Sequence, residues 1–127
     1  MTSAVVIDTC IVIDHLRGRD EARQYLRGLP ELPLLSAVTI AELYAGVREG
    51  GERTVLEALL TAFRVVPIDE PIARRGGLYR RQFHRSHGVG LVDALIAATA
   101  DAMGARLATL NVKHFPMFAD VIVPYRA

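Results

Sequence analysis

The chain has 127 residues, of which 51% are hydrophobic and 23% are charged, and its formal net charge is +1. This length and composition predict a single domain over residues 1–127 and argue against intrinsic disorder. The only cysteine, Cys10, excludes an intrachain disulfide and a CxxC zinc or redox site. No apolar stretch approaches the roughly 18 residues of a membrane span, and residues 1–3 lack the basic start of a secretion signal, so we expect a cytoplasmic protein without a membrane partner.

Strand-like and helix-like segments alternate along the whole chain. Short apolar runs predict strands at residues 4–7, 34–37, 65–68, 106–110 and 121–123. Apolar residues at helical spacing predict helices at residues 10–16, 20–27, 39–48, 52–63, 71–87 and 91–103. Because the strands are continuously apolar, the sheet should be covered on both faces. We therefore expect an α/β fold of three layers, with a mostly parallel sheet of about five strands flanked by helices.

Three acids lie near the starts of helices. Asp8 follows the first strand, Glu42 lies near the start of the helix after the second strand, and Asp93 lies near the start of the 91–103 helix. Each has an ordinary structural explanation: a helix N-cap for Asp8, a capping box of Thr39 with Glu42, and a favourable dipole position for Asp93. However, active sites of parallel sheets collect at the carboxyl ends of the strands, where Asp8 and Glu42 are expected.

Three converging carboxylates would repel one another unless a cation lay between them. Oxygen ligands, without a second cysteine or a histidine at ligand spacing, favour Mg²⁺ or Mn²⁺ over zinc. An ion held in this way is suited to phosphoryl chemistry. The residue types therefore predict a metal–carboxylate site.

A basic stretch without acids, RRGGLYRRQFHRSH, covers residues 74–87. Arginines interleaved with Tyr79 and Phe83 suit a nucleic acid, through its phosphates and its bases. The alternative is a solvated helix face whose Tyr79 and Phe83, four residues apart, point into the core. The RNA-binding candidates are Arg74, Arg75, Arg80, Arg81 and Arg85.

Four segments in chain order resemble the motifs of PIN-domain ribonucleases: VVIDTCIVIDHL, SAVTIAELYAG, VGLVDALIAATADAMGARLATLN and VKHFPMF. The resemblance is strongest to the toxin subunits of VapBC-type toxin–antitoxin pairs and extends over essentially the whole chain. Each motif alone is short, but four in the right order are specific. The resemblance implies a metal-dependent endoribonuclease, with Asp8, Glu42 and Asp93 as the catalytic, metal-ligating acids and Thr9 in support.

In the mechanism that this implies, Asp8 and Asp93 bind Mg²⁺ directly. Glu42 binds it directly or through water and accepts a proton from the nucleophile. The resemblance also implies an RNA substrate and a cognate antitoxin, which would lie along an apolar groove and place a basic side chain among the acids. A homodimer that assembles with the antitoxin into a larger complex is implied as well.

The segment after the fourth strand departs from the family pattern. Many relatives have a further Asp there, whereas this chain has Asn111, which offers an uncharged amide oxygen. Three acids instead of four argue against tight binding of a second ion. Thr109 and His114 are candidate polar neighbours of the expected site or of the phosphate, and for His114 we favour the alternative of a surface or core histidine. We assign Asp14 a solvent or structural role.

Two other functions are compatible with the same alternation of strands and helices and the same acids. A receiver-like signalling domain would accept phosphate on Asp69 after the third strand, but it needs a second acid next to Asp8, where this chain has Thr9 and Cys10. Asp69 also precedes Pro71, as a helix cap would. The other alternative is a non-catalytic RNA-binding module on the PIN-like fold.

Overall fold

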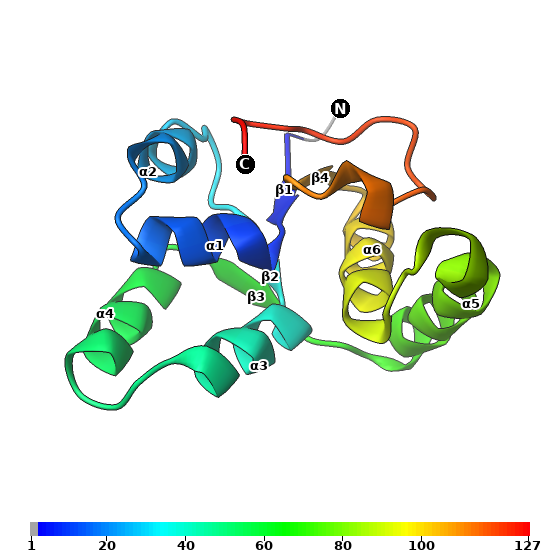
Figure 1. Cartoon of the computed structure of the whole chain (residues 1–127), viewed down its shortest axis with the longest axis horizontal. Coiled ribbons are helices and arrows are strands. Elements are labelled where there is room, and N and C mark those ends of the chain that lie inside the picture. The colour runs from blue at the N-terminus through cyan, green and yellow to red at the C-terminus, as the bar shows by residue number, and fades with distance from the viewer. Residues whose placement is uncertain (1–2) are drawn as a thin grey trace.

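A parallel four-stranded sheet forms the centre of the computed structural model, which describes residues 3–127 (Figure 1). Adjacent strands are parallel throughout, and Val6 of the first strand pairs with Leu34 on one side and Leu107 on the other. The expected α/β fold, a parallel sheet flanked by helices, is confirmed. The order across the sheet is β3-β2-β1-β4, and the strands are β1 (Val5–Ile7), β2 (Leu34–Ser36), β3 (Arg64–Val66) and β4 (Arg106–Ala108).

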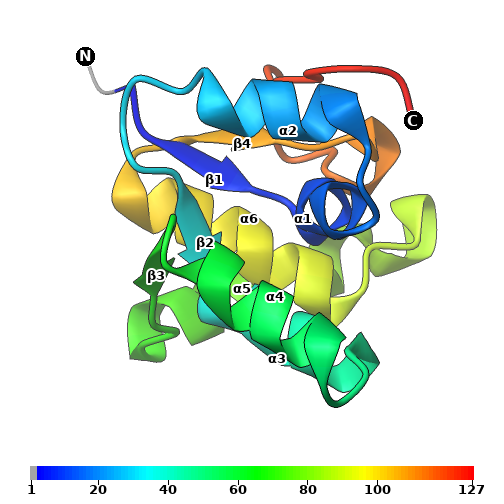
Figure 2. The ribbon, with the colours of Figure 1, turned by 90° about the vertical axis from the view of Figure 1, so that its left-hand side faces the viewer.

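Helices cover both faces of the sheet. α1, α2 and α4 lie on the face toward the viewer in Figure 2, and α6 lies behind the strands with α5 packed against it. Strand side chains alternate between the two faces, so Val5 and Ile7 join the core under α1, whereas Val6 joins the core under α6. The helices are α1 (Thr9–Leu16), α2 (Asp20–Arg27), α3 (Ala37–Gly46), α4 (Gly51–Leu60), α5 (Glu70–His87) and α6 (Leu91–Met103), followed by the 3-10 turn η1 (Val112–His114).

The strand expected at residues 121–123 does not form. Ile122 makes only an isolated parallel bridge with Ala108, in which Ile122 N donates to Leu107 O at 2.8 Å and Thr109 N donates to Ile122 O at 2.9 Å. Pro124 follows two residues later and has no N–H with which to continue the ladder. The sheet of residues 3–127 therefore has four strands where about five were expected.

The helix expected at residues 39–48 begins earlier, so the predicted capping box is wrong. Ser36 is the N-cap of α3, and its Oγ accepts a hydrogen bond from Val38 N at 3.2 Å. Thr39 consequently lies inside the helix and is buried. The predicted cap at Asp69 is confirmed, because its carboxylate accepts from Ile72 N at 3.1 Å.

The 91–103 helix has the predicted bounds. It lies unusually close to α5 at Gly76, where an added Cβ would stand 2.6 Å from Leu95 Cδ2. Among residues 3–127, no helix is both long and apolar enough to cross a membrane. The expectation that residues 1–3 form no secretion signal falls partly outside the described residues, which begin at Ser3.

Candidate active site

The candidate site residues gather where the carboxyl ends of the parallel strands meet. Asp8 directly follows β1 and caps α1, and Thr109 directly follows the neighbouring β4. Glu42 lies on α3, the helix that follows β2. Asp93 lies in the first turn of α6, which packs against β1 and β2. The fold therefore brings segments from the beginning, middle and end of the chain to one edge of the sheet.

Asp8 is the most buried of the three acids, with 4% of its surface exposed. Its Oδ1 accepts from Thr9 N at 2.8 Å, which makes it the N-cap of α1, and its Oδ2 accepts from Thr109 Oγ1 at 2.6 Å. Burial raises the pKa of Asp8, although these hydrogen bonds act in the opposite direction. Asp8 is therefore both the helix cap of the structural explanation and a fixed carboxylate at the strand end.

Thr9 connects α1 to the second acid. Its Oγ1 lies 2.7 Å from Glu42 Oε1 and 3.0 Å from Thr39 Oγ1. Because a carboxylate can only accept and the hydroxyl has one proton, we assign the Thr9 proton to Glu42. Thr39 was considered only as a capping residue in the sequence, and its place beside Thr9 becomes visible only once α1 and α3 are packed together.

Asp93 is half-buried, with 28% of its side chain exposed, and its Oδ2 lies 3.4 Å from His114 Nδ1. Its pKa is raised to about 6, first by burial and then by the negative charges of Asp8 and Glu42, whereas His114 acts to lower it. The three acids therefore repel one another, as expected for carboxylates of one site.

His114 is a surface histidine, with 38% of its side chain exposed, and its ring also lies against Asp93. The available signal was its place in the turn directly after β4, the strand that borders β1. Asn111 belongs to the same turn, where its side chain is exposed and its backbone N–H donates to Thr109 Oγ1 at 2.9 Å. Because Thr109 Oγ1 accepts this hydrogen bond, its own proton is donated to Asp8 Oδ2.

Comparisons with known proteins agree with this arrangement. The pattern of the PIN domain matches residues 5–119. The chain belongs to the PIN-domain family. It is 47% identical to Ribonuclease VapC10 of Mycobacterium tuberculosis, over 95% of this chain and 92% of that protein. It is also 46% identical to Ribonuclease VapC19 of the same organism, over 94% of this chain and 98% of that protein.

Solved structures of the same fold include a toxin–antitoxin complex. A toxin-antitoxin complex from Klebsiella pneumoniae matches with a TM-score of 0.84 at 31% identity, over 97% of this chain and 99% of that chain. FitAcB from Neisseria gonorrhoeae matches with a TM-score of 0.74 at 29% identity, over 94% of this chain and 97% of that chain. The resemblance inferred from the sequence motifs is confirmed.

Ribonucleases of the PIN family generally depend on a divalent metal, and the donor chemistry of this site is suitable for one. The ligands are carboxylate oxygens, which hard divalent cations prefer, and a cation would offset the repulsion that raises the pKa of Asp93. As they stand in residues 3–127, however, no three His, Cys, Asp or Glu side chains form a group that could hold an ion. Metal binding would therefore require the acid side chains to move.

The predicted basic stretch lies on α5. Tyr79 and Phe83 are half-buried with their ring centroids 6.4 Å apart, as the structural alternative predicted. All five arginines are exposed, but Arg74 pairs with Glu70 and Arg75 Nη1 lies 3.4 Å from Asp101 Oδ2. In the described chain, no ion pair involves the other three, Arg80, Arg81 and Arg85.

An apolar groove of about 550 Å³ lies beside the acids, between α1, α3 and α4. Glu42 belongs to its lining, so the groove opens directly onto the candidate site. Arg17, Arg48 and Glu52 add charges. Its apolar lining consists of Ile13, Leu16, Leu43, Val47 and Val55.

Proposed function

We propose that this protein is an endoribonuclease that depends on Mg²⁺ or Mn²⁺ and acts as the toxin of a toxin–antitoxin pair. The observation that supports this most is the placement of Asp8, Glu42 and Asp93 at the carboxyl edge of the sheet, where burial and the charges of Asp8 and Glu42 raise the pKa of Asp93 to about 6. Mutually repelling acids at the carboxyl edge of a PIN fold need a cation. The relatives at 47% and 46% identity are named ribonucleases.

In this proposal, Asp8 and Asp93 bind the ion directly, and Glu42 binds it directly or through water. When bound, a divalent ion stabilises negative charge on the phosphate and makes water a better nucleophile. Glu42 accepts the proton of the attacking water. Thr109 holds Asp8 in place through its 2.6 Å hydrogen bond, and Thr9 orients Glu42. Asn111 supports the site through the backbone N–H that fixes Thr109.

The RNA would be held by α5. Arg80, Arg81 and Arg85 are exposed and are the main candidates for phosphate contacts, whereas Arg74 and Arg75 would first have to leave Glu70 and Asp101. Their side chains can reach a strand without disturbing the core, because α5 is anchored by its opposite face against α6.

A cognate antitoxin would lie in the apolar groove and direct a basic side chain toward Glu42. This is supported by the groove's apolar lining and by the toxin–antitoxin complexes among the similar structures. We propose that residues 1–127 form one domain, that the protein is a cytoplasmic homodimer, and that the dimer assembles with the antitoxin into a larger complex.

The test is cleavage of RNA by purified Asp93→Asn in the presence of Mg²⁺. We expect a loss of at least about 100-fold, because a metal ligand should matter more than the outer residues that support it. The fold should survive, since Asn is also accepted at a helix start. Asp120→Asn, at an exposed acid that pairs with Arg106, is the control and should cleave within about twofold of the wild-type rate.

Cleavage by Asp93→Asn at the wild-type rate, or wild-type cleavage that resists a chelator, would contradict the proposal. RNA binding without metal and no cleavage with it would instead select the non-catalytic module. The binding measurement without metal is needed because no three His, Cys, Asp or Glu side chains of residues 3–127 form a group that could hold an ion. The receiver-like alternative would require labile phosphorylation of Asp69, whose carboxylate caps α5.

A further inference from the structure

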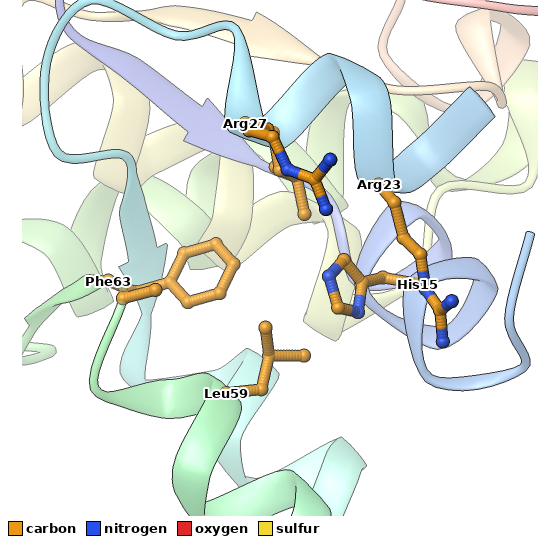
Figure 3. Close-up of a pocket in the computed structure, with 7 residues that line it drawn as sticks. His15, Arg23, Arg27, Leu59 and Phe63 are labelled. Atoms are coloured by element: carbon orange, nitrogen blue, oxygen red, sulfur yellow. The ribbon is translucent and has the colours of Figure 1, made fainter. Parts of the chain in front are cut away.

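A second pocket lies at the other end of α1 from Asp8, between α1, α2 and α4 (Figure 3). Its volume is about 160 Å³, which is enough for one small functional group with a short carbon chain. Figure 3 shows the His15 ring between Arg23 and Arg27, across from Leu59 and Phe63. The full lining consists of His15, Arg23, Leu26, Arg27, Leu59, Ala62 and Phe63.

The polar groups of this pocket lack partners within the described chain. Neither Arg23 nor Arg27 forms an ion pair among residues 3–127, although six other arginines of the described chain do so, from Arg19 to Arg106. His15 Nδ1 is buried and has no hydrogen-bond partner there. Burial lowers the pKa of His15, and the charge of Arg23 lowers it further. The pocket thus combines uncompensated positive charge with a buried polar nitrogen.

Helix stability explains only part of this arrangement. His15 and Arg27 lie in the last turns of α1 and α2, where the helix dipole favours a cation. Arg23 lies in the middle of α2, so the dipole does not account for it. Arg23 and Arg27 are one helical turn apart on α2, and both belong to the lining of the pocket.

We propose that this pocket binds a carboxylate carried on a short apolar body. A carboxylate can accept paired hydrogen bonds from a guanidinium and one from the His15 ring, while Leu26, Leu59 and Phe63 cover its carbon chain. A phosphodiester fits less well, because it would bring hydrophilic sugars against these apolar walls. The carboxylate can belong to a free small acid or to an acidic residue of a bound protein. The inference does not depend on the proposed nuclease activity.

The experiment uses the full 127-residue chain and follows the imidazole signals of His15 by NMR. The probes are hexanoate, acetate, 1-hexanol and inorganic phosphate. We expect hexanoate to shift the His15 signals saturably, and to bind about fivefold or more tightly than acetate, since it also buries apolar surface. Hexanol, which lacks the charge, and phosphate, which lacks the apolar body, should each bind more weakly than hexanoate.

Two variants test the role of the arginines. Arg23→Gln and Arg27→Gln should each weaken hexanoate binding about three- to tenfold, the range expected for a partly exposed charged hydrogen bond. Arg48→Gln, a control at an exposed arginine of the other groove, should bind like the wild type. Thermal melting of each variant checks that the fold is retained.

A further arm distinguishes the two sources of the carboxylate. Tighter binding of the capped tripeptide Leu-Glu-Leu than of hexanoate, lost when Gln replaces its Glu, indicates an acidic residue of a protein. Tighter binding of hexanoate indicates a free acid, and both results support the site. The proposal is overturned if His15 shows no saturable shift, if phosphate or hexanol equals hexanoate, or if both arginine variants bind like the wild type.

Discussion

Asp8, the N-cap of α1, and Asp14, within the same helix, differ in how the protein compensates their charges. Asp8 caps the helix, is 4% exposed, and has neutral hydrogen-bond donors and two further acids nearby. Asp14 lies less than two helical turns further along α1, and its charge is compensated. Tyr125 OH donates to its Oδ2 at 2.9 Å, and Arg19 Nη1 stands 3.5 Å from the same oxygen. The charge of Asp14 is thus balanced by Arg19, whereas no ion pair of the described residues balances the charge of Asp8, as expected for the metal ligand that we propose.

Asp14 in fact anchors the C-terminal segment. The guanidinium of Arg19 lies over the ring of Tyr125, 4.6 Å from its centroid, and Arg19 also donates to the carbonyl oxygen of Arg126. These contacts hold the end of the chain against the corner between α1 and α2. The structural role expected for Asp14 therefore has a specific form, and it gives the comparison with Asp8 testable consequences.

The largest expected difference is in RNA cleavage by Asp8→Asn and Asp14→Asn. Asp8→Asn should lose at least about 100-fold, because it removes a charge that would bind the metal. Asp14→Asn should cleave within about twofold of wild type, because its partners are Arg19 and Tyr125. The measurement is the initial cleavage rate with Mg²⁺ at matched protein concentrations. Equal losses in the two variants would contradict the assignment of different roles.

A smaller loss is expected from Thr109→Val, which keeps the shape of the side chain but removes the hydroxyl that donates to Asp8. Residues that orient a metal ligand typically contribute about 10- to 100-fold to affinity or activity. We expect a loss in that range, together with a higher Mg²⁺ concentration at half-maximal cleavage. Thr61→Val is the matched control, because its hydroxyl donates to Ala58 O on the exposed end of α4. An unchanged Mg²⁺ requirement in Thr109→Val would show that Asp8 is oriented by other contacts.

Much of the fold could be predicted from the sequence, because apolar runs and helical spacing are local signals. The 91–103 helix has the predicted bounds since Gly104 ends it in the left-handed conformation, with φ of 58°. The expected strand at residues 121–123 failed because an apolar triplet cannot show that only one residue reaches β4. The capping box failed because Thr39 and Ser36 are both plausible caps locally, and only the end of β2 decides between them.

The three candidate acids could be proposed from their positions after strands and near helix starts, but their contacts could not be predicted. The Thr9–Glu42 hydrogen bond joins residues 33 positions apart. The place of His114 beside Asp93 depends on how η1 packs against the start of α6. Such contacts depend on side-chain rotamers and tertiary packing, which leave no periodic signal in the sequence.

The repulsion at Asp93 predicts how Mg²⁺ stabilises the protein as the pH changes. The folded pKa of about 6 exceeds the ordinary value of 3.8, so without metal the contribution of Asp93 to stability falls as the pH rises through this interval. Solvent screening reduces this change in folding stability to about 1–2 kcal/mol. The raised pKa of Asp8 changes the stability in the same direction. Mg²⁺ should therefore raise the melting temperature by several degrees at about pH 7.5 and hardly at about pH 5.

In the same experiment, Asp93→Asn should lose most of this pH dependence, and Asp14→Asn should keep it. A Mg²⁺ effect of equal size at both pH values would contradict the picture of uncompensated acids.

The smallest expected effect is a loss of stability when Asp14 loses its hydrogen bond from Tyr125. Tyr125→Phe removes the hydrogen bond to Asp14 while leaving the ring under the guanidinium of Arg19, so the free energy of unfolding should fall by about 1 kcal/mol. Urea unfolding measures this loss, and the dependence of the unfolding free energy on urea concentration should stay unchanged. Tyr44→Phe, a change at an exposed ring near Arg53, is the control and should leave stability unaltered. RNA cleavage should stay at the wild-type rate in both variants, because neither hydroxyl contacts the acids at the sheet edge. A loss of cleavage in Tyr125→Phe would mean that the two aspartates of α1 are coupled through the helix, and the division between them would then be wrong.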